Sequence, residues 1–469
     1  MSHRASLLGR GYQDRHLDSP RVRFRRALTL CLMTIIFPGS AQSAVGSKFV
    51  GRIAQFAWIC LLSLGAFLAF TYFTDRATFL GYFTSSDKLA IARMALVSLG
   101  VLWLLLFIDA WRLASTFMLP FRRAAIITIV NIGIIAGVAG STTYASQLIK
   151  VSRDTVKTVF TATETSEPLM GRYNILMVGS DARKDRLGVR PDSLTVASID
   201  TSTGRTVLVS LPRNLQNVAF SADSPMRKVY PYGYNCGTTC LLNAVHTAAQ
   251  NRTDLYPNSD HPGLDATIDA VEGATDLKIN YFVMVNLNGF RGLVNAVGVV
   301  TMDVKTRIAM FGRDDSYKQT YIEPGRQNLD GQEALWYARS RVAADDFTRM
   351  GRQKCLMAAM LDQLSPQKVL TNATKIAASG KELLSTNIPE VELGQFADLA
   401  LKSRGEKIAV VSLVPPVVST VNPNFPAIHA MIKTAIAKSE KASVRSGTNK
   451  PKDPTQRAAN TTDDLAATC

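Results

Sequence analysis

Residues 331–353, GQEALWYARSRVAADDFTRMGRQ, carry the pattern that decides how the C-terminal half of this chain folds. The stretch concentrates cationic side chains in Arg339, Arg341, Arg349 and Arg352. A helix that begins at Asp345 or Asp346 and runs to about residue 364 would bring Asp346, Arg349, Arg352 and Gln353 onto one face. The apolar residues that follow on that side, Leu356, Met357 and Met360, predict that the C-terminal half of the helix is anchored in a core.

The arginine-rich end of this helix suits an anion. A guanidinium group donates paired hydrogen bonds to phosphate or pyrophosphate oxygens, and the positive end of the helix dipole favours the same charge. Gln353 adds an uncharged amide that can bond to phosphate or sugar oxygens. The sequence therefore predicts either a phosphate-binding site or, as the alternative, a charged helix end in solvent.

The composition predicts a membrane part joined to a globular part. The 469 residues are 47% hydrophobic, with a mean hydropathy of +0.07, which is too apolar for an ordinary soluble protein of this length. The net charge of +16 and the pI near 9.6 admit nucleic acid, an anionic membrane surface or phosphorylated substrates as partners.

The N-terminal residues 1–52 form a basic, cytoplasmic tail in this interpretation. Its apolar run, residues 27–37, is too short to cross a bilayer, so we read it as a re-entrant or interfacial segment or as a signal-peptide core. Within residues 53–145 the sequence predicts three transmembrane helices, at about residues 53–73, 89–110 and 124–145, each close to the length that a spanning helix needs.

Basic residues set the expected orientation. Arg112, Arg122 and Arg123 lie between the second and third runs, whereas the loop between the first and second holds only Arg76 and Lys88. By the positive-inside rule the N-terminus is cytoplasmic, and three crossings place the residues after about 146 outside the cell membrane. If one run does not span, that orientation is inverted.

The globular domain is expected over residues 169–436. Residues 146–168 read as a linker or as the end of the third helix, and residues 437–469 read as a disordered tail. Apolar runs, periodicity and turn residues predict the following elements: strands at 174–179, 193–199, 206–211, 278–285, 299–304 and 407–413, and helices at 241–252, 287–297, 389–403 and 427–438.

Charged residues cluster where the first three strands end. Asp181 and Arg183 follow the first strand, Arg190 and Asp192 precede or begin the second, and Arg213 follows the third. Two carboxylates beside arginines, without histidine or thiolate, suit a hard cation such as Mg²⁺ bound together with substrate phosphates. The alternative is that these are turn residues and surface ion pairs.

The cysteines outside the membrane part include one closely spaced pair. Cys236 and Cys240, in YNCGTTC, either close a small disulfide in an exported loop or stay as unpaired thiols. Cys355 falls among apolar helix residues and is read as a packing residue. His246 is interpreted as a packed or surface histidine rather than a catalytic one.

Separate motifs in the order GSDAR (179–183), RPDS (190–193), SLPRN (210–214), LDGQEALWYARSR (329–341) and DFTRMGRQ (346–353) resemble the LytR-CpsA-Psr family. The resemblance implies an α/β fold, with a central mixed β-sheet flanked by helices, on an N-terminal three-helix membrane anchor. It also implies that Asp181 and Asp192 are associated with Mg²⁺, for which Mn²⁺ is the alternative.

The same resemblance implies a pyrophosphate pocket. Its expected catalytic residues are Arg183, Arg190, Arg213, Arg339, Arg341, Asp346, Arg349 and Arg352. Gln353 is expected to contact the substrate together with Arg339, Arg349 and Arg352. A hydrophobic cavity between sheet and helices is expected to take a polyprenyl chain.

Members of this family attach glycopolymers to the bacterial cell wall. The resemblance therefore implies a phosphotransferase that moves a glycopolymer phosphate from a polyprenyl-pyrophosphate carrier to peptidoglycan, in contact with membrane lipids. Features shared with actinobacterial members point to arabinogalactan as the cargo, and pyrophosphatase-like activity is expected in vitro. The alternatives are a non-catalytic protein that binds or senses polyprenyl pyrophosphate, and a nucleic-acid-binding regulator. No nucleic-acid partner is expected, because neither a helix-turn-helix nor an aromatic stacking platform is evident.

Overall fold

The structure is a computed structural model that describes residues 20–114, 116, 119–180, 191–311, 319–342, 345–363, 384–404, 406–441 and 461–462. The chain divides into two compact units, Met1–Arg153 and Asp154–Cys469.

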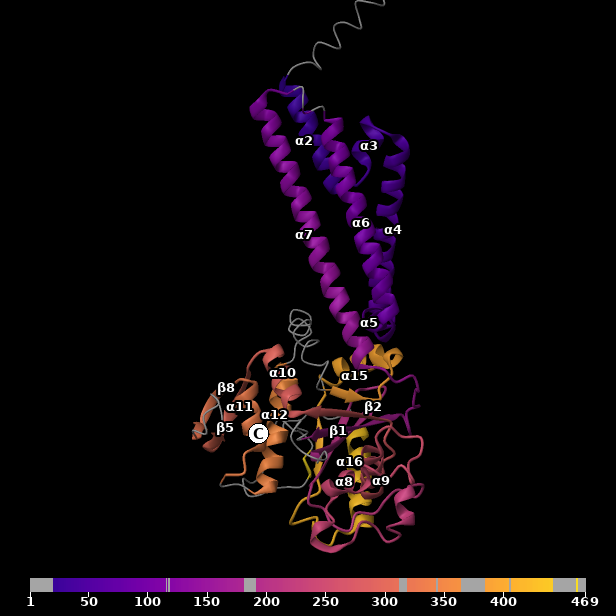
Figure 1. The fold of residues 1–469 in the computed structure, drawn as a ribbon, viewed down its shortest axis with the longest axis vertical. Helices are drawn as coiled ribbons and strands as arrows, with labels where there is room; N and C mark the ends of the chain where they lie inside the picture. Colours follow the sequence, from indigo (N-terminus) through magenta and orange to yellow (C-terminus); the bar gives the residue numbers. More distant parts are fainter. Residues whose placement is uncertain are drawn as a thin grey trace, which may run out of the picture. The chain divides into compact units, whose positions relative to one another are not determined.

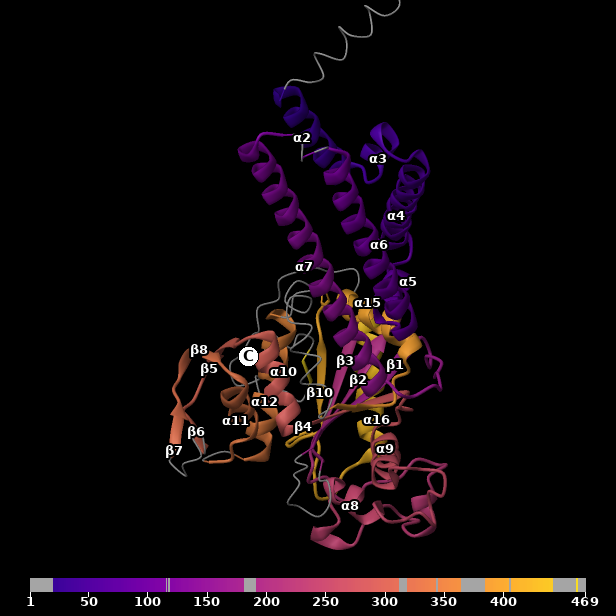
Figure 2. The same ribbon diagram turned by 45° about the horizontal axis from the view of Figure 1, so that its top comes forward.

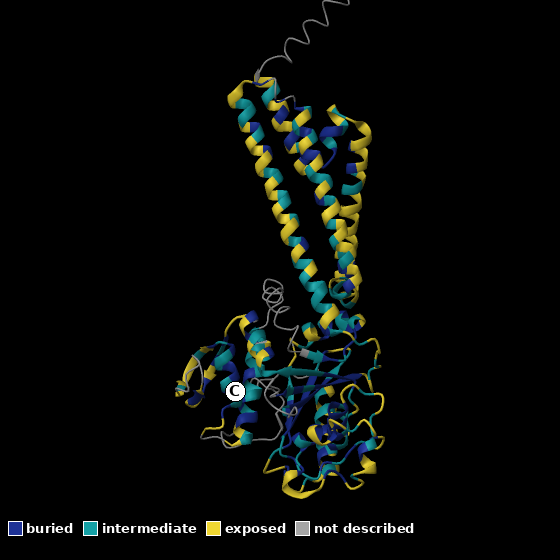
Figure 3. Ribbon diagram, in the orientation of Figure 1, coloured by how far each residue is buried: buried dark blue, intermediate teal, exposed yellow. Residues whose placement is uncertain are grey.

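The first unit is helical. Its helices are α2 (Pro20–Ile36), α3 (Ser40–Val45), α4 (Lys48–Thr74), α5 (Arg76–Thr84) and α6 (Ser86–Leu113), followed by the start of α7 (Phe121–Val159) (Figure 1). In the described residues three helices, α4, α6 and α7, are long and apolar enough to cross a membrane. Figure 3 shows exposed residues along the lengths of these helices, and many of them are large and apolar, as expected for surfaces that face lipid. Helix α7, the third of these apolar helices, continues past its expected end at residue 145 to Val159.

Helix α2 contains residues 27–36 of the short apolar run and packs on α6. The indole nitrogen of Trp103 donates a hydrogen bond of 3.1 Å to the carbonyl oxygen of Thr34. From the neighbouring helix α3, the Gln42 side chain donates one of 3.0 Å to the carbonyl oxygen of Leu106. The run is therefore helical and held within the first unit, while its re-entrant or interfacial placement stays a prediction.

The second unit is built on a mixed sheet of seven strands in the order β11-β10-β3-β2-β1-β4-β9. The strands are β1 (Arg172–Ser180), β2 (Pro191–Asp200), β3 (Thr206–Leu211), β4 (Tyr281–Asn286), β9 (Leu384–Thr386), β10 (Ala409–Ser412) and β11 (Thr461–Thr462). The pairs β1–β4 and β3–β10 are parallel and the others are antiparallel. The three expected N-terminal strands and their hairpin pairing are confirmed (Figure 2).

Side chains alternate between the two faces of this sheet, as the strand period requires. On one face Leu176 and Val178 belong to the main core, which is completed by residues of α8 (Val245–Ala249), α9 (Pro262–Thr275) and α16 (Phe425–Lys441). On the other face Tyr173 packs with α15 (Leu393–Ser403), and Met177 lies in a small cluster with Met357 of α12. Helices therefore cover both faces.

A second core lies beside the sheet. It is formed by α10 (Leu287–Val297), α11 (Gly331–Arg339) and α12 (Asp346–Gln363), by the antiparallel pair β5 (Val300–Val304) and β8 (Gly325–Leu329), and by the pair β6 (Ile308–Phe311) and β7 (Gln319–Ile322). Helix α12 contributes Leu356 to this core and Met357 to the face of the main sheet. The helix thus joins the two layers.

Several expected boundaries are wrong. The helix expected at 241–252 is a 3₁₀ turn, Leu242–Ala244, followed by the short α8, because its polar end turns away at residue 250. Helix α9 and strands β6 to β8 were not anticipated, since their apolar residues are interrupted by polar ones. In the tail expected to be disordered, Thr461–Thr462 pairs with β10, and the remainder after residue 441 lies outside the described residues. Further 3₁₀ turns are Pro225–Lys228, Gly237–Thr239 and Glu390–Glu392.

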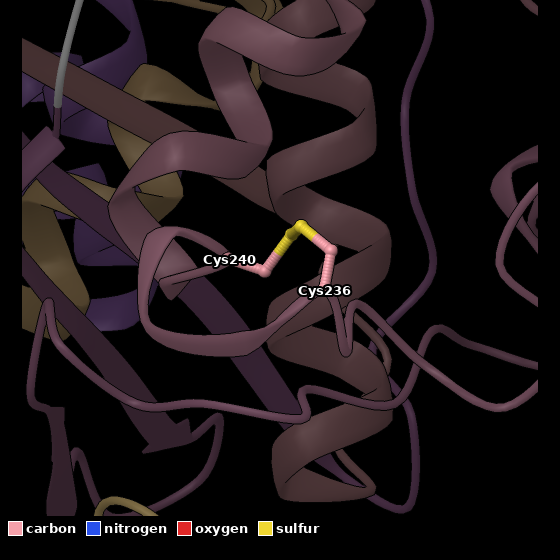
Figure 4. The surroundings of a disulfide bond; sticks show 2 residues. All are labelled: Cys236 and Cys240. Carbon is pink, nitrogen blue, oxygen red and sulfur yellow. A yellow bond between two sulfur atoms is a disulfide. The ribbon is translucent and has the colours of Figure 1, made fainter.

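The cysteine pair is joined. Cys236 and Cys240 form a disulfide across the Gly237–Thr239 turn (Figure 4). Cys355 packs against the second core, as interpreted from the sequence, and is itself disulfide-bonded. His246 is buried on α8, and burial followed by the charge of His261 lowers its pKa, so this histidine is a packed one.

Candidate functional site

The start of β2 and the end of β3 meet at one edge of the sheet. Gly179 pairs with Ser193 and Ser180 pairs with Pro191, so the register shifts and Asp192 falls at a bulge between them. A bulge re-aims the side chain of the extra residue. Asp192 is thereby brought to the position where Arg213 follows the end of β3.

The beginning of α12 explains why two aspartates stand side by side in the sequence. The Asp345 carboxylate accepts a hydrogen bond of 2.7 Å from the backbone nitrogen of Thr348 and so caps the helix. Asp346, the first residue of α12, is left to interact with the arginines. The sequence predicted that the helix begins at Asp345 or Asp346. In the structure Asp345 caps the helix and Asp346 belongs to the site.

Three arginines surround Asp192 and Asp346. Arg213 bridges the two carboxylates, with 2.9 Å from its terminal nitrogen to Asp192 Oδ1 and 2.9 Å from Nε to Asp346 Oδ2. Arg341 lies 3.7 Å from each carboxylate. Arg349 approaches Asp346 Oδ1 at 3.6 Å. We call these five residues the arginine–aspartate cluster.

The electrostatics of this cluster favour an anionic ligand. Burial raises the pKa of Asp346, but the hydrogen bond from Arg213 and the charges of Arg349, Arg213 and Arg341 outweigh burial and hold it below its usual value. Burial, the largest effect, lowers the pKa of Arg349, whose side chain is only 3% exposed. The three guanidinium groups and two carboxylates leave one net positive charge.

The other expected binding residues have different neighbours. Arg352 is buried and donates a hydrogen bond to the carbonyl oxygen of Ser340, at the end of α11. The Arg339 guanidinium lies 5.3 Å from the centre of the Trp336 ring. Gln353 accepts a hydrogen bond of 3.2 Å from Ser193 and donates one of 3.2 Å to the carbonyl oxygen of Ala338. Gln353 thus links α12 both to β2 and to α11.

A small cavity of about 30 Å³ lies between α12 and the sheet, next to the cluster. Its walls come from β2, β3 and α12 and are formed by Asp192, Ser193, Leu194, Thr195, Ser210, Leu211, Arg213, Arg349, Met350, Gln353, Lys354 and Met357. One end is therefore ionic, and the rest combines apolar leucine and methionine side chains with strand hydroxyls, Gln353 and Lys354. Apolar walls with a few placed polar and charged groups are typical of a ligand site.

The predicted magnesium ligands are only partly described. Asp181, Arg183 and Arg190 lie outside the described residues. Asp192 pairs through Oδ1 with Arg213 at 2.9 Å and with Arg341 at 3.7 Å. No group of three or more His, Cys, Asp or Glu side chains with metal-binding geometry occurs among the described residues. One carboxylate oxygen of the kind that Mg²⁺ prefers is thus present, and a second must come from elsewhere.

Sequence reasoning missed the sheet side of the cavity. Ser193, Thr195 and Ser210 face it from two strands, and Lys354 faces it from α12. The available signal was a lysine directly after Gln353, among residues whose spacing places them against a core. Strand hydroxyls gave no signal, because serine and threonine at those positions are equally common on exposed faces.

A model of the LytR_cpsA_psr family matches residues 138–441. The chain is 29% identical over 220 residues to a polyisoprenyl-teichoic acid–peptidoglycan teichoic acid transferase, TagV of Bacillus subtilis, covering 46% of this chain and 50% of that protein. It is 27% identical over 229 residues to the cell wall biosynthesis protein LcpA of Corynebacterium glutamicum, covering 44% of this chain and 43% of that protein. The chain thus spans about half the length of these curated relatives.

Solved structures also match part of this chain. The crystal structure of B. subtilis TagV covers 58% of this chain and 98% of its own, with 25% identity and a TM-score of 0.41. A structure of the LytR-CPS2A-psr family protein YwtF (TagT) with bound octaprenyl pyrophosphate lipid covers 58% of this chain and 94% of its own, with 20% identity and a TM-score of 0.38.

Proposed function

Because the chain belongs to the LytR_cpsA_psr family, we propose that it transfers a glycopolymer phosphate from a polyprenyl-pyrophosphate carrier to a hydroxyl group of peptidoglycan. The teichoic acid transferase of B. subtilis with 29% identity supports this class of reaction. The observation that carries the proposal is the arginine–aspartate cluster at the ionic end of the cavity.

The cluster suits the charge that develops during phosphoryl transfer. The acceptor hydroxyl oxygen forms a bond to the phosphorus that carries the glycopolymer, the bridging phosphorus–oxygen bond breaks, and polyprenyl monophosphate leaves with the electron pair, while the hydroxyl proton passes to solvent water. Preorganised guanidinium groups such as that of Arg349 stabilise this charge. The lowered pKa of Asp346 makes it a poor acceptor for the hydroxyl proton, so its role is to hold the arginines.

We propose that Asp192, together with Asp181, holds Mg²⁺, with Mn²⁺ as the alternative. The support is that the Asp192 carboxylate, of the oxygen-ligand type that Mg²⁺ prefers, lies at the ionic end of the cavity. The cation would supply further neutralisation of the pyrophosphate charge. Water in place of the acceptor hydroxyl would give pyrophosphatase-like activity, which belongs to the same proposal.

For the cargo we propose arabinogalactan, with teichoic acid as the second candidate. The likeness to a cell wall biosynthesis protein of Corynebacterium glutamicum supports the first, and the likeness to TagV supports the second. Glycan analysis of peptidoglycan from cells that lack this protein distinguishes them. Loss of galactose and arabinose would support arabinogalactan, and loss of polyol phosphate would support teichoic acid.

The three apolar helices support a multi-pass membrane anchor. In the proposed arrangement the N-terminus is cytoplasmic and the catalytic unit is extracytoplasmic, where peptidoglycan is found. A polyprenyl carrier resides in the same bilayer as such an anchor, so membrane lipids are part of the proposed surroundings of the enzyme.

The test is turnover of a polyprenyl-pyrophosphate-linked glycan by the full-length protein in lipid nanodiscs, with peptidoglycan fragments and Mg²⁺. We expect release of polyprenyl monophosphate, reduced by about 100-fold or more in Arg349→Ala, because one preorganised donor is lost. In Asp192→Ala, added Mg²⁺ is expected no longer to raise the rate of turnover. Arg307→Ala is the matched control. Arg307 also pairs with a carboxylate, that of Glu323 at 2.9 Å, but its side chain is 57% exposed.

The contrary result is lipid binding without turnover when an acceptor glycan is supplied. That outcome would overturn the transferase proposal and favour a protein that binds or senses polyprenyl pyrophosphate.

A further inference from the structure

A row of hydroxyl groups crosses the sheet beneath α12. Thr195 on β2 pairs with Ser210 on β3, and Ser210 pairs with Ser412 on β10. The Thr195 and Ser210 oxygens lie 3.5 Å apart, and all three residues are buried. The next positions on this face, including Ala197 and Leu208, are apolar. The sheet therefore presents a local polar strip within an otherwise apolar face.

Lys354 reaches this strip from α12. Its ammonium nitrogen donates a hydrogen bond to the Ser412 hydroxyl. Among the described residues no carboxylate lies within ion-pair distance of this nitrogen, although burial is sufficient to lower the pKa of Lys354. An ammonium group has three donors and a large cost of desolvation, so a site with only neutral hydroxyls leaves it undercompensated. An anion would compensate it.

The lysine and the arginine–aspartate cluster open onto the same cavity. Arg349 and Lys354 both line it, and five residues of helix separate them by about 7.5 Å along the axis. The cavity is small, at about 30 Å³. A ligand with two phosphates must therefore displace side chains. The flexible stem of Lys354 allows its ammonium group to move, whereas the short hydroxyl side chains are fixed on their strands.

We propose that Lys354, together with Thr195, Ser210 and Ser412, forms the subsite for the second phosphate of a pyrophosphate ligand. The first phosphate is held by the arginine–aspartate cluster. This inference rests on the proposed function, since it assigns one further part of the same ligand. When the ligand binds, its phosphate oxygens accept hydrogen bonds from the Lys354 ammonium group and from the strand hydroxyls. The hydrogen bond from Lys354 to Ser412 is then one of several that the ammonium group makes.

A purely structural role makes different predictions. If Lys354 only fastens α12 to β10, then Ser412→Ala should lower the free energy of unfolding about as much as Lys354→Met. Both substitutions should then change the affinity for every ligand by the same factor. A phosphate subsite instead changes the preference between ligands with two phosphates and ligands with one. The ratio of those affinities is therefore the informative quantity.

The experiment measures binding to the full-length protein in nanodiscs with three probes: polyprenyl pyrophosphate, polyprenyl monophosphate and inorganic pyrophosphate. In Lys354→Met we expect affinity for both pyrophosphates to fall by about tenfold or more, as for loss of hydrogen bonds to a charged group, with a much smaller change for the monophosphate. Lys354→Arg should retain most of the preference. Lys305→Met is the matched control, because Lys305 is a 68% exposed lysine beside Asp303 on β5.

An unchanged affinity ratio in Lys354→Met would overturn the subsite. If that variant does not fold, Lys354→Gln, which keeps a neutral donor, is measured in its place. Failure of the proposed function looks different, because it is seen as binding without turnover by the wild-type protein and leaves the affinity ratio of Lys354→Met unaffected. Wild-type protein that binds none of the three probes would overturn both proposals. Wild-type binding that is lost in Arg349→Ala but kept in Lys354→Met would reject the subsite alone.

Discussion

Arg213 joins both carboxylates of the site, although nothing in its own sequence neighbourhood requires this. Its side chain is 23% exposed and bridges Asp192, 29% exposed, to Asp346, 19% exposed. A methionine fills similar space but cannot bond to either carboxylate. Arg213→Met should therefore abolish transferase activity and lower the free energy of unfolding by roughly 1–3 kcal/mol.

Denaturant unfolding and the nanodisc assay measure these two effects. The control is Arg307→Met, which breaks the exposed pair with Glu323 and is expected to cost roughly 0–1 kcal/mol, without loss of activity. Equal destabilisation by the two substitutions would contradict a bridging role for Arg213.

Asp346 gives a pH-dependent prediction at the same scale. Its pKa in the folded protein is lowered from the usual value near 3.8, so the carboxylate stabilises the fold above that value. The contribution is lost as the pH falls through the lowered folded-state pKa. The difference in unfolding free energy between wild type and Asp346→Asn should be largest above about pH 5 and shrink toward pH 2.

Urea titrations at a series of pH values check this dependence. A difference that stays constant from pH 6 to the acid limit would show that Asp346 is not held ionised by its arginines.

At the scale of elements, α11 must approach α10 closely to bring Ser340 to Arg352. Gly331, the first residue of α11, donates a hydrogen bond of 2.7 Å to Asn295, and an added Cβ would overlap the carbonyl oxygen of Arg291. Backbone atoms cannot move aside cheaply. Gly331→Ala should therefore destabilise the protein by roughly 1–3 kcal/mol and reduce activity by displacing α11.

Gly351 is the matched glycine, because it lies inside α12 and an added Cβ would meet no atom within 4 Å. Gly351→Ala should raise the free energy of unfolding by up to about 1 kcal/mol, since alanine favours the helix. Thermal unfolding compares the two. A stabilising effect of Gly331→Ala would mean that the α10–α11 contact is looser than described.

At the scale of the whole molecule, the proposed orientation depends on all three apolar helices crossing the membrane. Alkaline phosphatase, which is active only outside the cytoplasm, should be active when fused after Ser85 or Lys441 and inactive when fused after Leu119. A complementary cytoplasmic reporter at the same positions controls for expression. Inactive phosphatase after Lys441 would place the catalytic unit in the cytoplasm, where peptidoglycan is absent.

Local pattern predicted much of the fold. The three apolar helices and strands β1, β2, β3 and β10 follow from hydropathy and period alone, because a buried strand or a spanning helix needs a continuous apolar run. The motifs also predicted the family and the arginines that now surround Asp346. Helix α9 and the small strands of the second core were missed, since their burial comes from neighbours distant in sequence.

The sequence by itself thus determined which chemical groups the protein has and which segments are apolar. Only the tertiary structure decided their partners: Arg213 meets Asp346 across 133 positions, Asp345 caps α12 while Asp346 enters the site, and Lys354 faces a strip of strand hydroxyls. The physical reason is one of range. Hydropathy and turn chemistry act over a few residues, whereas these contacts depend on strand order and on how α12 packs across the sheet.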